Sequence, residues 1–280
     1  MTPELSIVIP CFNGWDYTAA CLESITRHTP ETHEVILVDN GSTDGTGDRF
    51  AASWTGEGAL IRNASNLGFG VACNQGMAAA QGRCVMVLNN DTLATPGWFT
   101  AMAAALARDA RVGVAVPRSN FVNGRQAVEP VDYREAPSPE LDAFAQRRAS
   151  ERAGAGFTAT RISGLCMAIR RSVLEAIGGF DPAFGLGNFE DDDFGLRARI
   201  AGYELWVCDD SFIHHFGSRT FARLPDAYTR LMAENALRFE AKWGLSLEAD
   251  RDLERAARRP FNPDEHRVDL GRWAVSGGPH

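Results

Sequence analysis

The first 116 residues alternate short, mostly apolar runs with longer stretches in which apolar residues recur every three or four positions. A short apolar run bounded by turn residues is typical of a buried strand, and the longer spacing is typical of a helix packed on one face. Strands are expected at residues 5–9, 35–38, 59–62, 85–88 and 112–116, and helices at 16–28, 70–81 and 96–108. Repeated strand–helix units predict an α/β fold, with a Rossmann-like, mostly parallel central sheet flanked by helices.

Polar residues follow two of these expected strands directly. Asp39 ends the second strand, and Asn89, Asn90 and Asp91 follow the fourth. Ligands of parallel sheets bind beyond the carboxyl ends of the strands, where a carboxylate can accept hydrogen bonds from a base or a ribose. Asp and Asn also cap turns for purely structural reasons, so that alternative stays open for each residue taken singly. Their common place at one edge of the sheet favours a binding site.

The regular pattern breaks after residue 119. Prolines punctuate residues 120–156, which we interpret as an insertion covering the site, with a surface helix at 139–152. Further strands are expected at 164–169 and 203–207, and further helices at 172–177 and 226–243. We therefore divide the chain into a first half at 1–118, a second half at 119–245, and a polar extension at 246–280 that is a docking arm or partly disordered.

Four adjacent acids, Glu190–Asp193, form the sharpest feature of the second half. Acids at a helix start complement the helix dipole, which is a sufficient explanation for one or two of them. Four exceed that need, and their mutual repulsion is expected to raise the pKa of at least one. The run is therefore a candidate for acid–base chemistry.

Composition narrows the class of function and the compartment. The formal net charge of −8 argues against nucleic-acid binding, which needs clustered basic residues. Six scattered cysteines without a close pair predict no disulfide framework and no zinc site, as in a reducing cytoplasm. No basic leader and no apolar stretch of about 18–20 residues is present, so we expect a soluble, cytoplasmic protein.

Six segments in order carry a resemblance to a known family. They read SIVIPCFNG (6–14), VILVDNGSTDGT (35–46), NLGFGVACNQG (66–76), VLNNDT (87–92), GLCMAIRRSVLEAIGGF (164–180) and NFEDDDFGLRARIAG (188–202). Over roughly residues 5–220 the chain resembles the family 2 glycosyltransferases, including bacterial rhamnosyl and glycosyl transferases of cell-surface glycan synthesis. The resemblance implies the GT-A fold, with an acceptor-side region and a C-terminal helical extension, and inverting sugar transfer from a nucleotide sugar.

The resemblance makes residues 1–118 the nucleotide-sugar-binding half and residues 119–245 the acceptor-binding and catalytic-base half, and it implies a role for individual residues. Asp191 would be the general base, and Glu190 would position the acceptor. Asp91 would carry Mn²⁺ or Mg²⁺, together with His215 or, less in line with the pattern, His214; a merely structural histidine pair is the alternative. The nucleotide sugar would be bound by Pro10, Cys11, Phe12, Asn13, Asp39, Asn66, Gly68, Asn89 and Asn90.

The sequence departs from the family pattern at one position of the site and offers two further sets of candidate residues. Asn89 stands where many relatives have the first Asp of an Asp-x-Asp motif. Arg62 or Arg219 could assist the metal in neutralising the diphosphate, since the chain holds a single lysine. Trp98 and Phe189 lie next to the chemistry and are candidates for stacking on a sugar.

The expected partners are a UDP-, dTDP- or GDP-sugar donor and a glycan, lipid-linked or protein acceptor. Peripheral association with the inner face of the membrane is compatible with such an acceptor. A nucleotidyltransferase is the first alternative, but the loop at residues 10–14 lacks the basic residues usual there. A non-catalytic binding module is the second, and the combination of Asp39, Asp91 and Asp191 argues against it.

Overall fold

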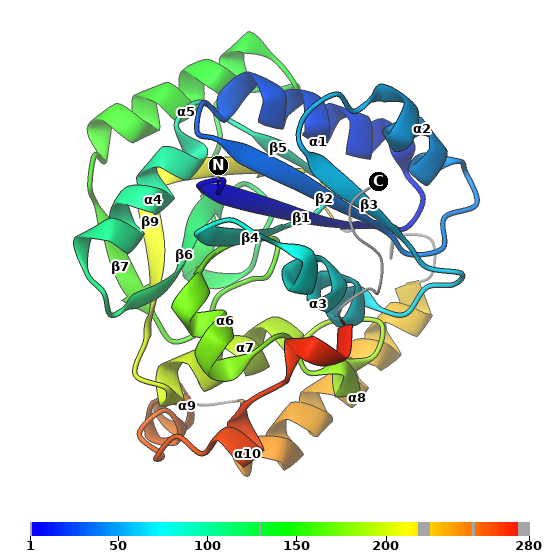
Figure 1. Ribbon diagram of the computed structural model, residues 1–280. Coiled ribbons are helices and arrows are strands. Elements are labelled where there is room, and N and C mark those ends of the chain that lie inside the picture. Colours follow the sequence, from blue (N-terminus) through cyan, green and yellow to red (C-terminus); the bar gives the residue numbers. More distant parts are fainter. Residues whose placement is uncertain (1, 129, 218–224, 248–249, 274–280) are drawn as a thin grey trace.

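The computed structural model describes residues 2–128, 130–217, 225–247 and 250–273. A single sheet with strand order β3-β2-β1-β4-β8-β6-β9-β5 runs through the molecule, and β7 pairs with β9 outside this order. Helices cover both faces of the sheet (Figure 1). The expected α/β architecture, a central sheet flanked by helices, is confirmed.

The amino-terminal half is a parallel sheet built as the apolar runs predict. Its strands are β1 (Leu5–Cys11), β2 (His33–Asp39), β3 (Gly58–Arg62) and β4 (Cys84–Leu88). Strand β1 pairs in parallel with β2 and β4, and β2 pairs in parallel with β3. The connecting helices are α1 (Trp15–His28), α2 (Thr46–Ser53) and α3 (Phe69–Ala79).

The second half of the sheet is mixed, because β8 (Cys166–Arg170) lies antiparallel between β4 and β6 (Val112–Ser119). Strand β9 (Glu204–His215) pairs in parallel with β6. Two short strands, β5 (Thr92–Ala94) and β7 (Gly156–Ala159), pair antiparallel with β9. The parallel pairing predicted from the strand–helix repeat is therefore interrupted by β8 and resumes between β6 and β9.

Strand β9 continues well past residue 207, where the sequence pattern predicted its end. The register with β6 jumps between Pro117, which faces Cys208, and Arg118, which faces Phe212. The polar residues in between form an irregularity of the strand instead of a turn. Asp209 there pairs with Arg118 (2.5 Å) and with Arg148 from α5 (Pro139–Glu151). His214 and His215 consequently lie within the strand and not after it.

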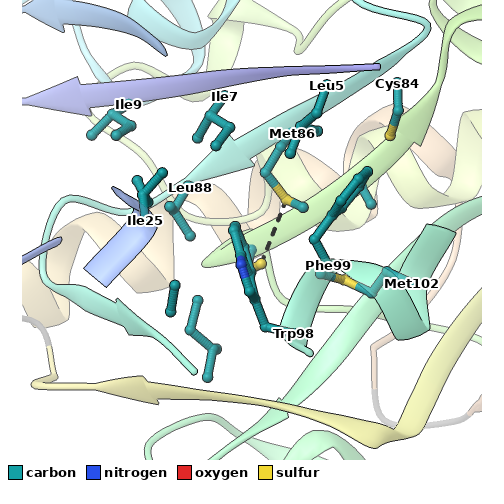
Figure 2. Close-up of a cluster of buried hydrophobic side chains, with 14 of the residues drawn as sticks. Leu5, Ile7, Ile9, Ile25, Cys84, Met86, Leu88, Trp98, Phe99 and Met102 are labelled. Atoms are coloured by element: carbon teal, nitrogen blue, oxygen red, sulfur yellow. Dashed lines mark hydrogen bonds between the residues drawn. The ribbon is translucent and has the colours of Figure 1, made fainter. Parts of the chain in front are cut away.

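Side chains of the sheet alternate between two buried clusters. Leu5, Ile7 and Ile9 of β1 pack with α1 and with α4 (Trp98–Arg108) on one face, whereas Val8 packs with α3 on the other. Figure 2 shows Trp98 and Phe99 of α4 beneath the strand residues of the first cluster. Trp98 is fully buried, and its Nε1–H donates to Thr29 Oγ1 (3.1 Å). It is a core residue, so its expected role in sugar stacking is wrong.

The second face is covered by α6 (Arg171–Ile177) and α7 (Glu190–Ile200), and the C-terminal helices pack along α7 (Figure 1). These helices are α8 (Pro225–Trp243), α9 (Asp250–Ala256) and α10 (Pro263–His266). Phe239 and Trp243 share a buried cluster with Leu253 and with Leu196 of α7. The described part of the tail thus docks on its own domain. Among the described helices, none is both long and apolar enough to cross a membrane.

Candidate active site

One cavity of about 940 Å³ opens where β1 and β4 end and α7 begins. Ten of the residues predicted for the site line this cavity, although they come from five separate segments of the chain. They are Pro10, Cys11, Phe12, Asn66, Asn89, Asn90, Asp91, Glu190, Asp191 and His215. The fold therefore brings most of the predicted site together in one place.

Asp91 and His215 form the centre of one wall. Strand β5 begins directly after Asp91, and its first residue, Thr92, is paired with His215 on β9. The two side chains meet with 3.1 Å between Asp91 Oδ1 and His215 Nε2. Burial alone would lower the pKa of His215, but the hydrogen bond and the charge of Asp91 raise it above the ordinary value.

The other ring nitrogen of His215 is also engaged. Nδ1 lies 2.8 Å from the carbonyl oxygen of Phe121. The backbone carbonyl accepts a hydrogen bond from Nδ1–H, so that in the neutral ring the lone pair is on Nε2 and is directed toward Asp91. Such an orientation suits a histidine that shares a cation with a carboxylate. An imidazole nitrogen beside a carboxylate oxygen is a competent donor pair for Mn²⁺ or Mg²⁺.

Asn120 holds the backbone of His215 through a pair of side-chain hydrogen bonds. His215 N–H donates to Asn120 Oδ1 (2.8 Å), and Asn120 Nδ2 donates to the His215 carbonyl (3.1 Å). The amide side chain thus continues the strand pairing of β9 where β6 ends. The sequence pattern did not identify Asn120, because its function depends on a residue 95 positions away.

His214 does not line the cavity, which corrects its place among the predicted metal ligands. Successive side chains of a strand point to opposite faces, and His214 points into the cluster around Tyr133. Its Nδ1 lies 2.8 Å from the Tyr133 hydroxyl. Burial, together with the neighbouring charge of His215, lowers the pKa of His214 to about 4, so it is a neutral core residue.

The candidate metal site has two protein donors, Asp91 and His215. In the described part of the chain, no group of three or more His, Cys, Asp or Glu side chains is arranged to hold a metal ion. Mg²⁺ and Mn²⁺ are often held by one or two protein groups, with phosphate oxygens and water completing the shell. The Asp91–His215 pair fits that arrangement.

The four acids at the start of α7 have different surroundings. Asp191 lies at the cavity wall, where its Oδ2 accepts from Gly164 N–H (2.7 Å) and its Oδ1 from Asp192 N–H (2.9 Å). Burial, with a further contribution from the charge of Asp192, raises the pKa of Asp191 to about 7. Burial, together with the charge of Asp191, likewise raises the pKa of Glu190 well above its ordinary value.

Asp192 and Asp193 are engaged in ion pairs. Asp192 receives two hydrogen bonds from Arg161, at 2.7 and 2.6 Å. Asp193 is fully buried and pairs with Arg197 (2.8 Å) and Lys242 (2.5 Å). Asp192 nevertheless lines the cavity beside Glu190 and Asp191, whereas Asp193 is not among the residues that line it.

A short segment ties the two walls of the cavity together. The backbone N–H of Asn89 donates to the carbonyl of Leu165 (2.9 Å), while Gly164 donates to Asp191. A Cβ at Gly164 would lie 3.1 Å from the Cβ of Asp191, which is closer than most such contacts. The glycine thus lets the β8 segment approach α7 and sets Asp191 near the loop that carries Asp91.

The loops after β1, β2 and β3 meet on the opposite side of the cavity, and Asn40 organises them. Its Nδ2 donates to Asn66 Oδ1 (2.9 Å), and its Oδ1 accepts from Asn63 Nδ2 (3.0 Å) and Leu67 N–H (3.0 Å). Asn40 lines the cavity, yet the sequence pattern singled out only its neighbour Asp39. Its buried amide fixes the loop that presents Asn66.

Three of the predicted nucleotide-binding residues are not among those that line the cavity. Asn13 Oδ1 accepts from Thr43 N–H (2.8 Å), and Asp39 Oδ1 accepts from Ser42 N–H (2.9 Å). A Cβ at Gly68 would come 2.0 Å from the carbonyl oxygen of Gly185, so glycine is required there for packing. These contacts give each residue a structural role, and their contact with a nucleotide stays a prediction.

Other predicted side chains have partners of their own. Asn90 lines the cavity, but its Nδ2 donates to Thr18 Oγ1 (2.9 Å) of α1. Arg62 pairs with Asp48 (2.7 Å), and Arg219 lies outside the described residues. Phe189 lines the cavity as expected.

Known proteins similar to this chain agree with the resemblance noted in the sequence. The model of the family described as Glycosyl transferase family 2 matches residues 6–178. An N-acetylglucosaminyl-diphospho-decaprenol L-rhamnosyltransferase of Mycobacterium tuberculosis is 30% identical over 246 residues, which cover 77% of each chain. An uncharacterized protein of Sinorhizobium fredii is 26% identical over 254 residues, 83% of this chain but only 27% of that protein.

A solved structure with a similar fold is that of a mannosyltransferase from Pyrobaculum calidifontis, in complex with GDP-Man and Mn²⁺. The TM-score is 0.65 at 20% sequence identity, and the match covers 92% of this chain and 68% of the other. At this identity the likeness concerns the fold.

Proposed function

The chain belongs to glycosyl transferase family 2, and from that membership and its cavity we propose a metal-dependent, inverting transfer of a sugar from a nucleotide-sugar donor to a hydroxyl group. The observation that carries the proposal is the assembly of three groups in one cavity. Asp91 and His215 offer donors for a divalent cation, and Asp191 offers a carboxylate that can take a proton.

Asp91 Oδ1 and His215 Nε2 would hold Mn²⁺ or Mg²⁺. When bound, the cation neutralises the charge that develops on the departing diphosphate. The chain's own contribution is orientation, since Phe121 and Asn120 fix the ring and the backbone of His215. The Mn²⁺ in the similarly folded mannosyltransferase supports this assignment.

Asp191 would accept the proton of the acceptor hydroxyl as that oxygen attacks the anomeric carbon. A general base works best when its pKa lies near the working pH, and the pKa of about 7 at Asp191 meets that condition. Glu190, the neighbouring carboxyl group at the cavity wall, would position a substrate hydroxyl instead of accepting its proton. A single displacement from the face opposite the diphosphate inverts the anomeric configuration.

The nucleotide would lie on the side of β1 and β2, beyond the carboxyl ends of these strands. Pro10, Cys11, Phe12 and Asn66 would contact it directly, because they line the cavity there. Asn89 and Asn90 would face the diphosphate or the sugar. Asp39, Asn13 and Gly68 would shape the nucleoside pocket from behind, and Asp39 Oδ2 remains able to accept a hydrogen bond from a base or ribose.

The donor would be a UDP-, dTDP- or GDP-sugar, and the acceptor a glycan, a lipid-linked sugar or a protein. The similar rhamnosyltransferase of Mycobacterium tuberculosis acts, by its name, on a lipid-linked diphosphate sugar and transfers L-rhamnose, which supports testing an L-rhamnosyl donor and a lipid-linked acceptor first. Such an acceptor would bring the protein to the cytoplasmic face of a membrane. The division into halves at residues 1–118 and 119–245, followed by an extension, corresponds in this proposal to donor and acceptor sides.

The test is a transfer assay with purified protein. UDP-, dTDP- and GDP-sugars are offered with short glycan and lipid-linked acceptors in Mn²⁺, in Mg²⁺ and in excess chelator, and release of nucleoside diphosphate is measured. We expect acceptor-dependent release that chelation abolishes and added metal restores. The anomeric configuration of the product, read by NMR, should be opposite to that of the donor. Full transfer after exhaustive metal removal, or a product of retained configuration, would contradict the proposal.

A further inference from the structure

Buried polar atoms without a hydrogen-bond partner gather in the cavity. Within the residues that the structure describes, seven buried side-chain nitrogen and oxygen atoms lack a partner. Three of them belong to residues that line this cavity, namely Asn89 Oδ1, Asn188 Nδ2 and Glu190 Oε2. An unpaired buried polar group costs ~1–3 kcal/mol, so groups of this kind at a cavity wall indicate that a ligand completes their hydrogen bonds.

Asn188 is held in a defined orientation. Its backbone is left-handed (φ 74°), a conformation that asparagine tolerates better than most residues. Asn235 of α8, fully buried, donates to the carbonyls of Phe184 (2.8 Å), Gly187 (2.8 Å) and Asn188 (3.2 Å), and so fixes the loop.

The side-chain amide of Asn188 is oriented by Tyr228. The Tyr228 hydroxyl donates to Asn188 Oδ1 (3.3 Å). Because the oxygen end faces Tyr228, the Nδ2 end faces away from it, and no acceptor for Nδ2 is found in the described parts of the chain. Asn188 therefore presents two unused N–H donors at the cavity wall.

Glu190 stands two residues further along the same wall. It is 5% exposed, and its Oε2 has no donor among the described residues. Glu190 nevertheless lines the cavity. A buried carboxyl group at a cavity wall is suited to a ligand hydroxyl.

We propose that Asn188 Nδ2 and Glu190 Oε2 together bind two hydroxyl groups of one sugar ring, and that Asn188 is a specificity-determining residue of the transferase. This inference rests on the proposed sugar transfer. One hydroxyl group of the ring can accept a hydrogen bond from the amide while a second exchanges a hydrogen bond with the carboxyl group. A sugar that lacks the hydroxyl opposite Asn188 leaves the amide unpaired and is rejected for that reason.

The sugar ring belongs either to the donor or to the acceptor, and binding experiments separate the two. The variant is Asn188→Gly, because glycine adopts a left-handed backbone without strain and removes the amide entirely. Titrations without acceptor compare the nucleotide sugar that the wild-type enzyme turns over with its nucleoside diphosphate. Acceptor KM is then measured at saturating donor.

If the ring is that of the donor, Asn188→Gly weakens nucleotide-sugar binding about 10-fold, the worth of a hydrogen bond of ~1.4 kcal/mol, and leaves binding of the nucleoside diphosphate unchanged. If the ring is that of the acceptor, donor binding is unchanged and the acceptor KM rises about 10-fold. In either case, singly deoxygenated analogues of that sugar should identify one hydroxyl whose removal weakens wild-type binding but not binding to Asn188→Gly. If the substitution only loosened the loop, removal of that hydroxyl would weaken binding to the wild type and to Asn188→Gly alike.

Tyr228→Phe provides a matched variant, since it keeps the ring and removes the hydroxyl that orients the amide. We expect it to weaken the same sugar by a smaller factor than Asn188→Gly. Unchanged donor affinity and unchanged acceptor KM in Asn188→Gly would overturn the assignment while sugar transfer itself stands. Failure of the wild-type protein to bind or turn over any sugar nucleotide would instead overturn the proposed function, and this inference with it.

Discussion

Asp191→Asn separates catalysis from architecture at the start of α7. The carboxylate accepts one hydrogen bond from Gly164 and one from Asp192. Asparagine has one oxygen, so it can keep one of these bonds and turns an N–H donor toward the other. The loss of one buried hydrogen bond costs ~1–3 kcal/mol. The loss of the proton acceptor should lower turnover by about 10²–10⁴.

The raised pKa predicts an opposite effect on stability. Because the pKa of Asp191 rises from 3.8 to about 7 on folding, the folded state binds the proton more tightly than the unfolded state. Stability of the wild-type protein therefore falls as pH rises between these values, by roughly 4 kcal/mol for a shift of this size. Asparagine carries no charge, so the variant escapes this loss. At pH 8 its lost hydrogen bond should be offset, and it should be as stable as the wild type or more so.

The assay combines two measurements over pH 5 to 9. Nucleoside diphosphate release should increase in the wild type as pH passes through about 7, and the variant should lack this limb. Urea unfolding at pH 5 and at pH 8 gives the stability difference. The affinities for nucleotide and for Mn²⁺ should stay near their wild-type values, because other residues are proposed to bind the nucleotide and the metal ion.

Asp192→Asn is the matched control, since it lies in the same turn and pairs with Arg161. It should retain turnover, and its rate limb should move to lower pH, because the charge of Asp192 raises the pKa of Asp191. Normal turnover in Asp191→Asn, or an unaltered pH limb, would refute the assignment of the base.

Three further predictions address the remaining groups. His215→Ala should abolish Mn²⁺ binding measured by titration without donor, whereas His214→Phe should retain it; loss in both variants would contradict the placement of the two rings on opposite faces of β9. Asp39→Ala should weaken nucleotide binding in a titration by ~1.5–3 kcal/mol. An unchanged affinity would mean that Asp39 only stabilises its turn, through the hydrogen bond from Ser42. Asp193→Asn should lower the free energy of unfolding in urea by ~3–5 kcal/mol, because it removes a buried partner of Arg197; a stability within error of the wild type would show that this ion pair is dispensable.

Local patterns in the sequence determined the elements of the amino-terminal half. Buried parallel strands read as apolar runs because both of their faces are covered, and residues 35–38 and 85–88 lie within β2 and β4 as expected. The same locality placed polar residues at the strand ends, so that Asp91 and Asn89 could be assigned to one edge of the sheet. Family motifs extended this to Asp191, which lies at the cavity with them.

Tertiary structure alone decided the pairing of strands in the second half. An antiparallel strand such as β8 has the same apolar composition as a parallel one, so its direction does not appear in its own sequence. The polar residues around Asp209 resemble a turn, yet their charges are satisfied by arginines distant in the chain. Strand β9 therefore continues through them, because its partners and not its composition determine its length.

Only the tertiary structure distinguishes the roles of adjacent residues of the same type. His214 and His215 are indistinguishable in sequence, and only their alternation along β9 directs one to Tyr133 and the other to Asp91. The acids of α7 differ for a similar reason, since each meets a different neighbour around the helix, such as Lys242 at Asp193. The sequence specifies which chemical groups are available. The hydrogen bonds and ion pairs that give each group its role join residues far apart in the sequence, which come together only in the folded protein.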